Sequence, residues 1–119
     1  ADRVCRVLQR TRSVRRVLVS SFDATLIARA KSRLPRLSVA LISQRSPAHA
    51  LRRAQQLGCS SWHPHRRMVR PSLIKQAHDA GLRVHVWTVD RPADAKRLAR
   101  MGVDGLFTNV PDRIRSALT

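Results

Sequence analysis

Short apolar runs alternate along the chain with longer segments in which apolar residues recur at helical spacing. Strands are predicted at residues 17–21, 39–43, 60–63, 84–89 and 105–108, and the first two of these contain continuous apolar runs. Runs of this kind are typical of parallel strands that are covered on both faces. The segments between them carry apolar residues three or four positions apart and predict helices. These helices are expected at residues 2–9, 24–34, 47–57, 71–80, 91–101 and 111–118.

Helix start and stop signals support this division of the chain. Asp23 and Asp90 stand directly before two of the helical segments, where an N-cap side chain belongs. Gly58, Gly81 and Gly102 follow three of the segments, in the position that commonly ends a helix. Strand and helix thus alternate throughout, which predicts an α/β fold with a parallel sheet and right-handed crossovers. No linker interrupts the pattern, so residues 1–119 are expected to form a single domain.

The number of strands raises a physical difficulty. About five parallel strands are too few to close an eight-stranded barrel. An open version of such a sheet leaves edge strands unpaired and one face without a helix layer. The sheet therefore requires a partner, a rearrangement or additional sequence. In the first helix, Val4, Val7 and Leu8 are expected to share the buried face.

The chain is strongly basic, and this bears on its partners. It has 24 Lys and Arg against 7 acidic residues, a formal net charge of +17, and the acids are all Asp. Such a charge attracts polyanions such as nucleic acids, anionic membranes and phosphate-bearing ligands. Lys or Arg is present in every predicted helix, and this spread favours a solvated or partner-facing surface over a dedicated basic site. A basic nucleic-acid-binding module is an alternative function. There is no zinc-finger spacing and no aromatic RNA-binding string, so specific recognition of a nucleic acid is not expected.

The cysteines and the hydropathy pattern limit the setting of the chain. Cys5 and Cys59 are isolated, without CxxC spacing, and lie in apolar segments. Buried free thiols are the expected outcome, which suits a reducing cytoplasm. No apolar run approaches the ~18 residues of a membrane-spanning helix, so no membrane span is predicted.

Four stretches of sequence, taken in order, resemble a known family. They are Val-Ser-Ser-Phe at 19–22, Ala-His-Asp-Ala-Gly at 77–81, Val-His-Val-Trp-Thr-Val at 84–89 and Gly-Val-Asp-Gly-Leu-Phe-Thr-Asn-Val-Pro at 102–111. Their order and spacing are similar to those of the second half of the glycerophosphodiester phosphodiesterase barrel. The resemblance implies the C-terminal half of a TIM-like (β/α)8 barrel. This chain has Asp90 where the family usually has Asn, and it has Asn109 where the family usually has Asp.

The resemblance also implies an activity and a cofactor. Members of the family hydrolyse glycerophosphodiesters to glycerol 3-phosphate and an alcohol, a reaction of lipid metabolism, with a divalent ion such as Mg²⁺ or Ca²⁺. Their acid/base histidines and metal-binding carboxylates lie in the other half of the barrel, which begins with a His-Arg-Gly motif absent here. No catalytic residue and no metal ligand is therefore assigned in this chain. It is expected to be inactive alone and to need either the N-terminal half or a second copy as a homodimer.

The resemblance assigns four residues of this chain to the substrate site. Phe22 and Trp87 match the aromatic residues that line the pocket at the strand ends. The alternatives are packing of Phe22 against the following helix and a core role for Trp87. Asn109 precedes a helix start near the last strand, where phosphate binds in many barrels, although a cap or turn explains it equally. His65 is the fourth candidate, with loop packing as its alternative.

The remaining histidines have plainer interpretations. His63 and His65 flank a proline and, with Trp62 and Arg66, form the one compact polar-aromatic cluster in the sequence. His85 lies on the same face of its strand as Trp87, and a hydrogen-bonded core histidine is expected there. His78 lies in a last helical turn, where a partly charged imidazole interacts favourably with the helix dipole. None of these residues predicts a metal site, because too few ligands accompany them.

Overall fold

The strands form one parallel sheet whose spatial order is the order of the sequence. The computed structural model describes all of residues 1–119. Every strand pairs in parallel with the next along the chain, which confirms the predicted α/β class. The five strands are β1 (Leu18–Ser21), β2 (Ser38–Ser43), β3 (Ser61–Pro64), β4 (Arg83–Val86) and β5 (Gly105–Leu106).

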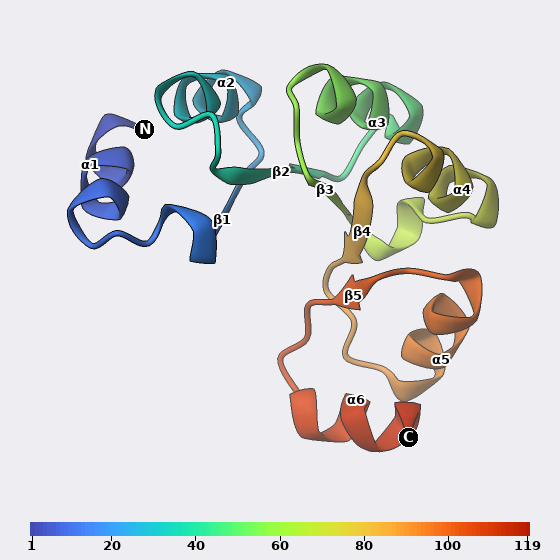
Figure 1. Ribbon diagram of the computed structural model, residues 1–119. Helices are drawn as coiled ribbons and strands as arrows, with labels where there is room; N and C mark the ends of the chain where they lie inside the picture. The colour runs from blue at the N-terminus through green and yellow to red at the C-terminus, as the bar shows by residue number, and fades with distance from the viewer.

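Six α-helices lie on the outer side of this sheet, which bends into an open arc (Figure 1). They are α1 (Asp2–Arg10), α2 (Ala24–Arg33), α3 (Pro47–Gln56), α4 (Pro71–Asp79), α5 (Pro92–Met101) and α6 (Pro111–Leu118), with short 3₁₀ turns η1 (Val14–Arg16) and η2 (Arg66–Met68). Asp23 caps α2 as predicted, because its carboxylate accepts hydrogen bonds from the backbone of Thr25 and Leu26. No helix covers the concave side of the arc.

The two faces of the sheet differ sharply in burial. On the convex face, Val39 and Trp62 are fully buried beneath the helices. On the concave face, Leu18 is 40% exposed and Phe22 is 59% exposed. The prediction that the 17–21 run is covered on both faces is therefore wrong. Its physical cause is the open arc, since β1 has neither a neighbour on its outer edge nor a layer above its concave face.

The first helix buries a different stripe from the predicted one. Cys5 and Leu8 are buried, whereas Val4 and Val7 are 46% and 52% exposed. Helix α1 lies at the end of the arc and packs against α2. Cys5 and Leu8 are three positions apart and share the side of α1 that packs against α2. Val4 and Val7 lie outside this contact and are exposed.

The fourth strand ends earlier than the apolar run suggests. Regular pairing stops at Val86, and Trp87 makes only an isolated bridge to His65. The alternation of a regular strand also ends there. Val89, two residues after Trp87, would share its face in such a strand, yet Val89 is fully buried and Trp87 is partly exposed. The peptide bond between Trp87 and Thr88 is cis. Regular strand β4 covers only Arg83–Val86, whereas the predicted strand covers residues 84–89.

Gly102 provides a stability prediction for the fold. It ends α5 with a φ of +94°, and a Cβ added there would meet no heavy atom within 4 Å. Gly102→Ala should therefore lower the free energy of unfolding by about 1 kcal/mol through backbone strain alone. Gly102→Asn, which tolerates left-handed backbone better, should lose less. Urea denaturation followed by circular dichroism would measure both, and equal losses would contradict this explanation.

Candidate functional site

Phe22 and Trp87 meet at the carboxyl edge of the sheet although they follow strands that are not neighbours. Their ring centroids are 5.8 Å apart and their planes are perpendicular. Two strands lie between β1 and β4, so only the curvature of the sheet brings these side chains together across its concave side. They wall a hollow of about 240 Å³ that Ser20, Ile42, His63 and Phe107 complete. An aromatic hollow of this kind suits an apolar or polyol part of a small ligand.

One hydrogen bond and one aromatic contact hold the indole ring of Trp87 in place. Its Nε1 donates a hydrogen bond to the backbone oxygen of His63 at 2.9 Å. The imidazole of His65 packs edge-on against the same ring, with centroids 4.8 Å apart. Of the predicted site residues, Phe22 and His65 thus each contact Trp87, which lies between them.

His65 has both ring nitrogens occupied within its own loop. Nδ1 accepts a hydrogen bond from the backbone of Arg67, and Nε2 lies 3.3 Å from a guanidinium nitrogen of Arg66. Burial, together with the charges of Arg66 and Arg67, lowers the pKa of His65. A neutral imidazole held in this way orients Trp87 and the loop. The four-residue cluster predicted from sequence does not form, because Trp62 points to the convex face and bonds to Ser43.

His63 and His85 form a pair beneath the aromatic hollow. His63 Nε2 lies 3.0 Å from His85 Nδ1 and 3.2 Å from the hydroxyl of Ser61. Burial, reinforced by the neighbouring His85, lowers the pKa of His63 to about 4. Burial likewise lowers the pKa of His85. His85 is hydrogen-bonded as expected from its strand position, but it is only partly buried, and the core member of the pair is His63. Gly105 lies against His85, and an added Cβ would come within 2.8 Å of the ring.

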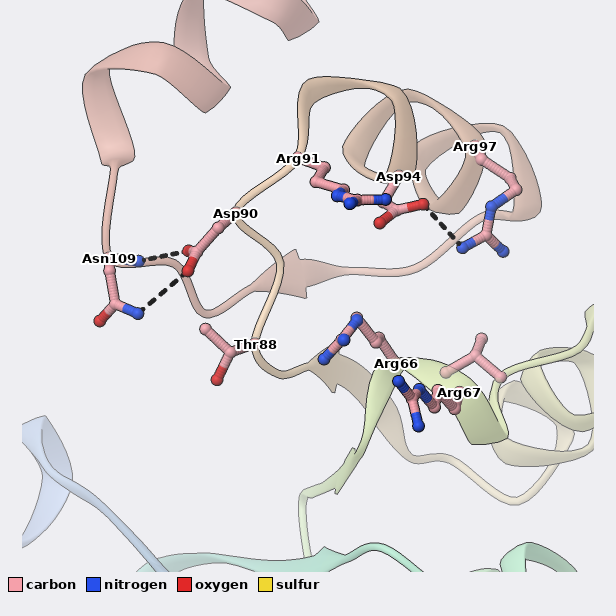
Figure 2. Close-up of a pocket in the computed structure, with 9 residues that line it drawn as sticks. Arg66, Arg67, Thr88, Asp90, Arg91, Asp94, Arg97 and Asn109 are labelled. Atoms are coloured by element: carbon pink, nitrogen blue, oxygen red, sulfur yellow. Dashed lines mark hydrogen bonds and ion pairs between the residues drawn. The ribbon is translucent and has the colours of Figure 1, made fainter.

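Asp90 does not cap α5, and this corrects the prediction. The N-cap position of α5 is Arg91, without a side-chain bond. The Asp90 carboxylate instead accepts bonds from the Thr108 hydroxyl, the Asn109 backbone and the Asn109 side-chain amide, at 2.9, 2.8 and 3.1 Å. These bonds, the Asn109 backbone first, lower the pKa of Asp90. The carboxylate prefers these donors because they lie together on the next loop. Asn109 is thereby fixed at the carboxyl edge (Figure 2).

Asp104 has a structural role that the sequence did not reveal. Its Oδ2 accepts hydrogen bonds from the Val84 backbone at 2.7 Å and lies 2.8 Å from His78 Nε2. The bond ties the end of α4 to the segment before β5. His78 does lie in the last turn of α4, but its partner is this carboxylate. The two residues are 26 positions apart, and no local pattern links them.

A second hollow lies on the same edge and is rich in arginine. Its volume is about 740 Å³, and we call it the arginine pocket. Figure 2 shows that η2 supplies one side of it and the start of α5 the other, with the Asp90 and Asn109 pair nearby. Sequence reasoning missed this pocket because its arginines come from separate segments and resemble all the others in composition. Its charged residues are Arg66, Arg67, Arg91, Arg97, Asp90 and Asp94.

The chain offers no place for a resident metal ion. No three His, Cys, Asp or Glu side chains gather in a group that could hold one. Divalent ions such as Mg²⁺ need several oxygen ligands together, and Asp90 is already engaged with three donors. The residues present therefore do not fit a divalent metal site. None of the helices is long and apolar enough to cross a bilayer.

A curled parallel sheet with outer helices and side chains gathered at its carboxyl edge defines the class of this protein. It is a (β/α)-barrel protein, in which ligand sites lie at the carboxyl ends of the strands. Residues 1–113 match the model of the glycerophosphoryl diester phosphodiesterase family. The chain belongs to this family.

Individual relatives agree with this assignment. A glycerophosphodiester phosphodiesterase of Caldanaerobacter subterraneus is 30% identical over 99 residues, which cover 83% of this chain and 41% of the relative. A structure from Silicibacter pomeroyi DSS-3, classed as a glycerophosphoryl diester phosphodiesterase, superimposes with a TM-score of 0.89 at 32% identity, over 97% of this chain and 42% of that one. An Oleispira antarctica phosphodiesterase in complex with the product sn-glycerol-3-phosphate gives 0.78 at 26% identity, over 85% and 41%.

The matched proteins are longer than this chain. It spans about 41% of the Caldanaerobacter relative and 42% of the Silicibacter structure. The match therefore concerns part of the barrel of these proteins. Phe22, Trp87, His65 and Asn109 all lie at its carboxyl edge. Phe22 and His65 each pack against Trp87, and Asn109 is bound to Asp90.

Proposed function

We propose that this chain forms one wall of the substrate site of a glycerophosphodiester phosphodiesterase. The activity is hydrolysis of a glycerophosphodiester to glycerol 3-phosphate and an alcohol. The chain binds and orients the substrate, and the remaining barrel strands of the enzyme supply the acid, the base and the metal ligands. Alone, it does not turn over substrate. The observation that carries this proposal is the perpendicular contact of Phe22 and Trp87 at the carboxyl edge.

The geometry supports a positioning role for the two aromatic rings. The indole of Trp87 cannot rotate freely, because its Nε1 is bonded to the His63 backbone and its face is held by His65. Phe22 leans on it from the far side of the arc and is 59% exposed to the concave space. A rigid aromatic corner holds the carbon skeleton of glycerol at low entropic cost. Asn109, held by Asp90, presents its remaining carbonyl and the nearby start of α6 toward the same edge.

The chemistry of the reaction must come from outside these residues. A divalent ion supplies Lewis-acid activation of the phosphate in this family. The lack of any three-ligand group here supports an inactive isolated chain. His63 and His85 bond to one another beneath the hollow, and burial lowers the pKa of both, to about 4 for His63, so both imidazoles are weak bases.

The test compares the chain alone with a chimaera. The 119 residues would replace the matched part of the Silicibacter protein, which is 32% identical over this region. With glycerophosphocholine and glycerophosphoinositol 4-phosphate assayed separately, each with Mg²⁺ or Ca²⁺, we expect glycerol 3-phosphate from the chimaera with at least one of them and none from the chain alone. In the chimaera, Trp87→Ala should lower kcat/KM by about tenfold or more, chiefly through KM, because a binding wall is lost.

The control is Leu118→Ala, an exposed apolar residue on α6 away from the strand ends. It should leave kcat and KM unchanged. A chimaera that unfolds cooperatively but releases no glycerol 3-phosphate would contradict the proposal, as would metal-dependent turnover by the chain alone.

Self-association is a second candidate role, and one observation favours it. Leu18, Phe22 and Phe107 expose 40%, 59% and 44% of their surface on the concave side. A twofold pair of chains could bury this face instead of the remaining barrel strands. Sedimentation separates the two ideas, since a dimer is required by the second candidate and a monomer excludes it.

A further inference from the structure

We propose that the arginine pocket binds an anionic group on the alcohol side of the substrate. The preferred substrate is then a glycerophosphodiester whose head group carries a further phosphate, and not one with a cationic head group such as choline. This inference rests on the proposed function, because the head group belongs to its substrate. It goes further in assigning a site and a chemical class to the part of the substrate beyond the scissile bond.

The charges in the pocket are unbalanced. Four guanidinium groups face two carboxylates. Both carboxylates are already engaged, since Asp90 accepts three hydrogen bonds from the β5 loop and Asp94 pairs with Arg97 at 3.3 Å. No carboxylate lies within 4.0 Å of the guanidinium groups of Arg66, Arg67 or Arg91.

The positive field of this pocket already acts on a neighbouring group. Burial is the largest cause of the lowered pKa of His65, and the charges of Arg66 and Arg67 lower it further. Guanidinium groups without acidic partners attract phosphate, which they bind in a planar, often bidentate geometry. A quaternary ammonium group would instead be repelled.

The arginine pocket lies next to the aromatic hollow of Phe22 and Trp87. Thr88, the residue after Trp87, lines it, and the backbone of Arg66 donates to the Trp87 oxygen at 2.7 Å. Arg66 also contacts His65, whose ring packs on Trp87. With the glycerol of the diester at Trp87, we place its other substituent in the adjacent arginine pocket, which lies between η2 and the start of α5 (Figure 2). A volume of about 740 Å³ accommodates a phosphorylated polyol.

Equilibrium binding to the 119-residue chain tests this assignment without turnover. The two probes are glycerophosphoinositol 4-phosphate and glycerophosphocholine, titrated calorimetrically at low salt. We expect the first to bind about tenfold tighter or more. Arg67→Ala with Arg91→Ala should abolish this difference, because it removes two unpaired charges from the pocket. Neither side chain makes a hydrogen bond or ion pair in the fold, so the folded state should persist.

The matched control removes the same charge elsewhere. Arg52→Ala with Arg53→Ala changes two exposed arginines on α3 and should alter the affinity for glycerophosphoinositol 4-phosphate less than twofold. Equal weakening by the two double variants would overturn the proposal and show only general attraction to a chain of net charge +17. Equal binding of the two probes would also overturn it.

The outcomes stay separate from those of the proposed function. If the chimaera hydrolyses glycerophosphocholine while the probes bind alike, this inference fails and the proposed function stands. If Arg67 and Arg91 govern binding of the anionic probe but the chimaera hydrolyses no diester, the anion site exists and its role as a substrate head-group site is overturned.

Discussion

Trp62→Ala should destabilise the chain more than any other single substitution in β3. Its indole is fully buried between the sheet and the outer helices, and its Nε1 donates to the Ser43 hydroxyl at 2.8 Å. Truncation leaves a large cavity and an unpaired hydroxyl, and such changes cost about 3–5 kcal/mol. A domain of this length has a total stability on the order of 10 kcal/mol, so the loss is a large fraction of it. Urea denaturation monitored by far-UV circular dichroism would measure it.

The second tryptophan of the chain is the matched control. Trp87 lies on the concave side, is partly exposed and gives up one hydrogen bond and two edge contacts on truncation. Trp87→Ala should therefore cost only about 1–2 kcal/mol. Trp62→Phe separates volume from hydrogen bonding and should fall between the two. If Trp62→Ala and Trp87→Ala lost equal stability, the assignment of Trp62 to the helix-covered core would be wrong.

The chain should lose stability as the pH falls from 7 toward 4, and His63 is the main cause. Burial lowers its pKa from an ordinary 6.5 to about 4 in the folded state. Between these values the unfolded chain binds a proton at this residue and the folded chain does not, so acid favours unfolding. A difference of about 2.5 pH units corresponds to about 3 kcal/mol, fully present above pH 6.5 and gone below pH 4. His65 and His85, whose pKa values are also lowered, act in the same direction.

Urea titrations at pH 7 and pH 4.5 would test this dependence. In His63→Gln the difference between the two pH values should shrink, whereas His49→Gln, an exposed change on α3, should leave it intact. The carboxylates do not account for a loss of stability between pH 7 and pH 4.5. Asp2, Asp90 and Asp104 have pKa values lowered from 3.8, so their contributions to stability are lost at lower pH. Stability that is constant from pH 7 to 4.5 would contradict the prediction.

The order of strands and helices was accessible from the sequence because its causes are local. Apolar runs, Asp23 as a cap and glycines at helix ends act over a few residues, and the structure has each of these elements. The details that failed depended on neighbours. The pair Val4 and Val7 and the pair Cys5 and Leu8 both have helical spacing, so the spacing does not distinguish them. The position of α2 decides which pair is buried.

The candidate site was predictable only where a resemblance supplied it. Phe22 and Trp87 were chosen by their motifs, and their contact required the curvature of the sheet. The same holds for Asp90, which local reasoning made a cap although its donors lie 18 and 19 residues away on the β5 loop. The arginine pocket had no sequence signal, because Arg66 and Arg91 look like any other arginine in so basic a chain.

The sequence by itself determined which segments form strands and helices, that the strands run parallel, and that the chain is basic with no glutamate. Periodicity, capping and composition are properties of short stretches, so they survive without knowledge of the fold. The tertiary structure decided which face of each element is covered and which distant side chains meet at the carboxyl edge. Those outcomes depend on how far the sheet bends, and that curvature arises from the packing of all its strands and helices together.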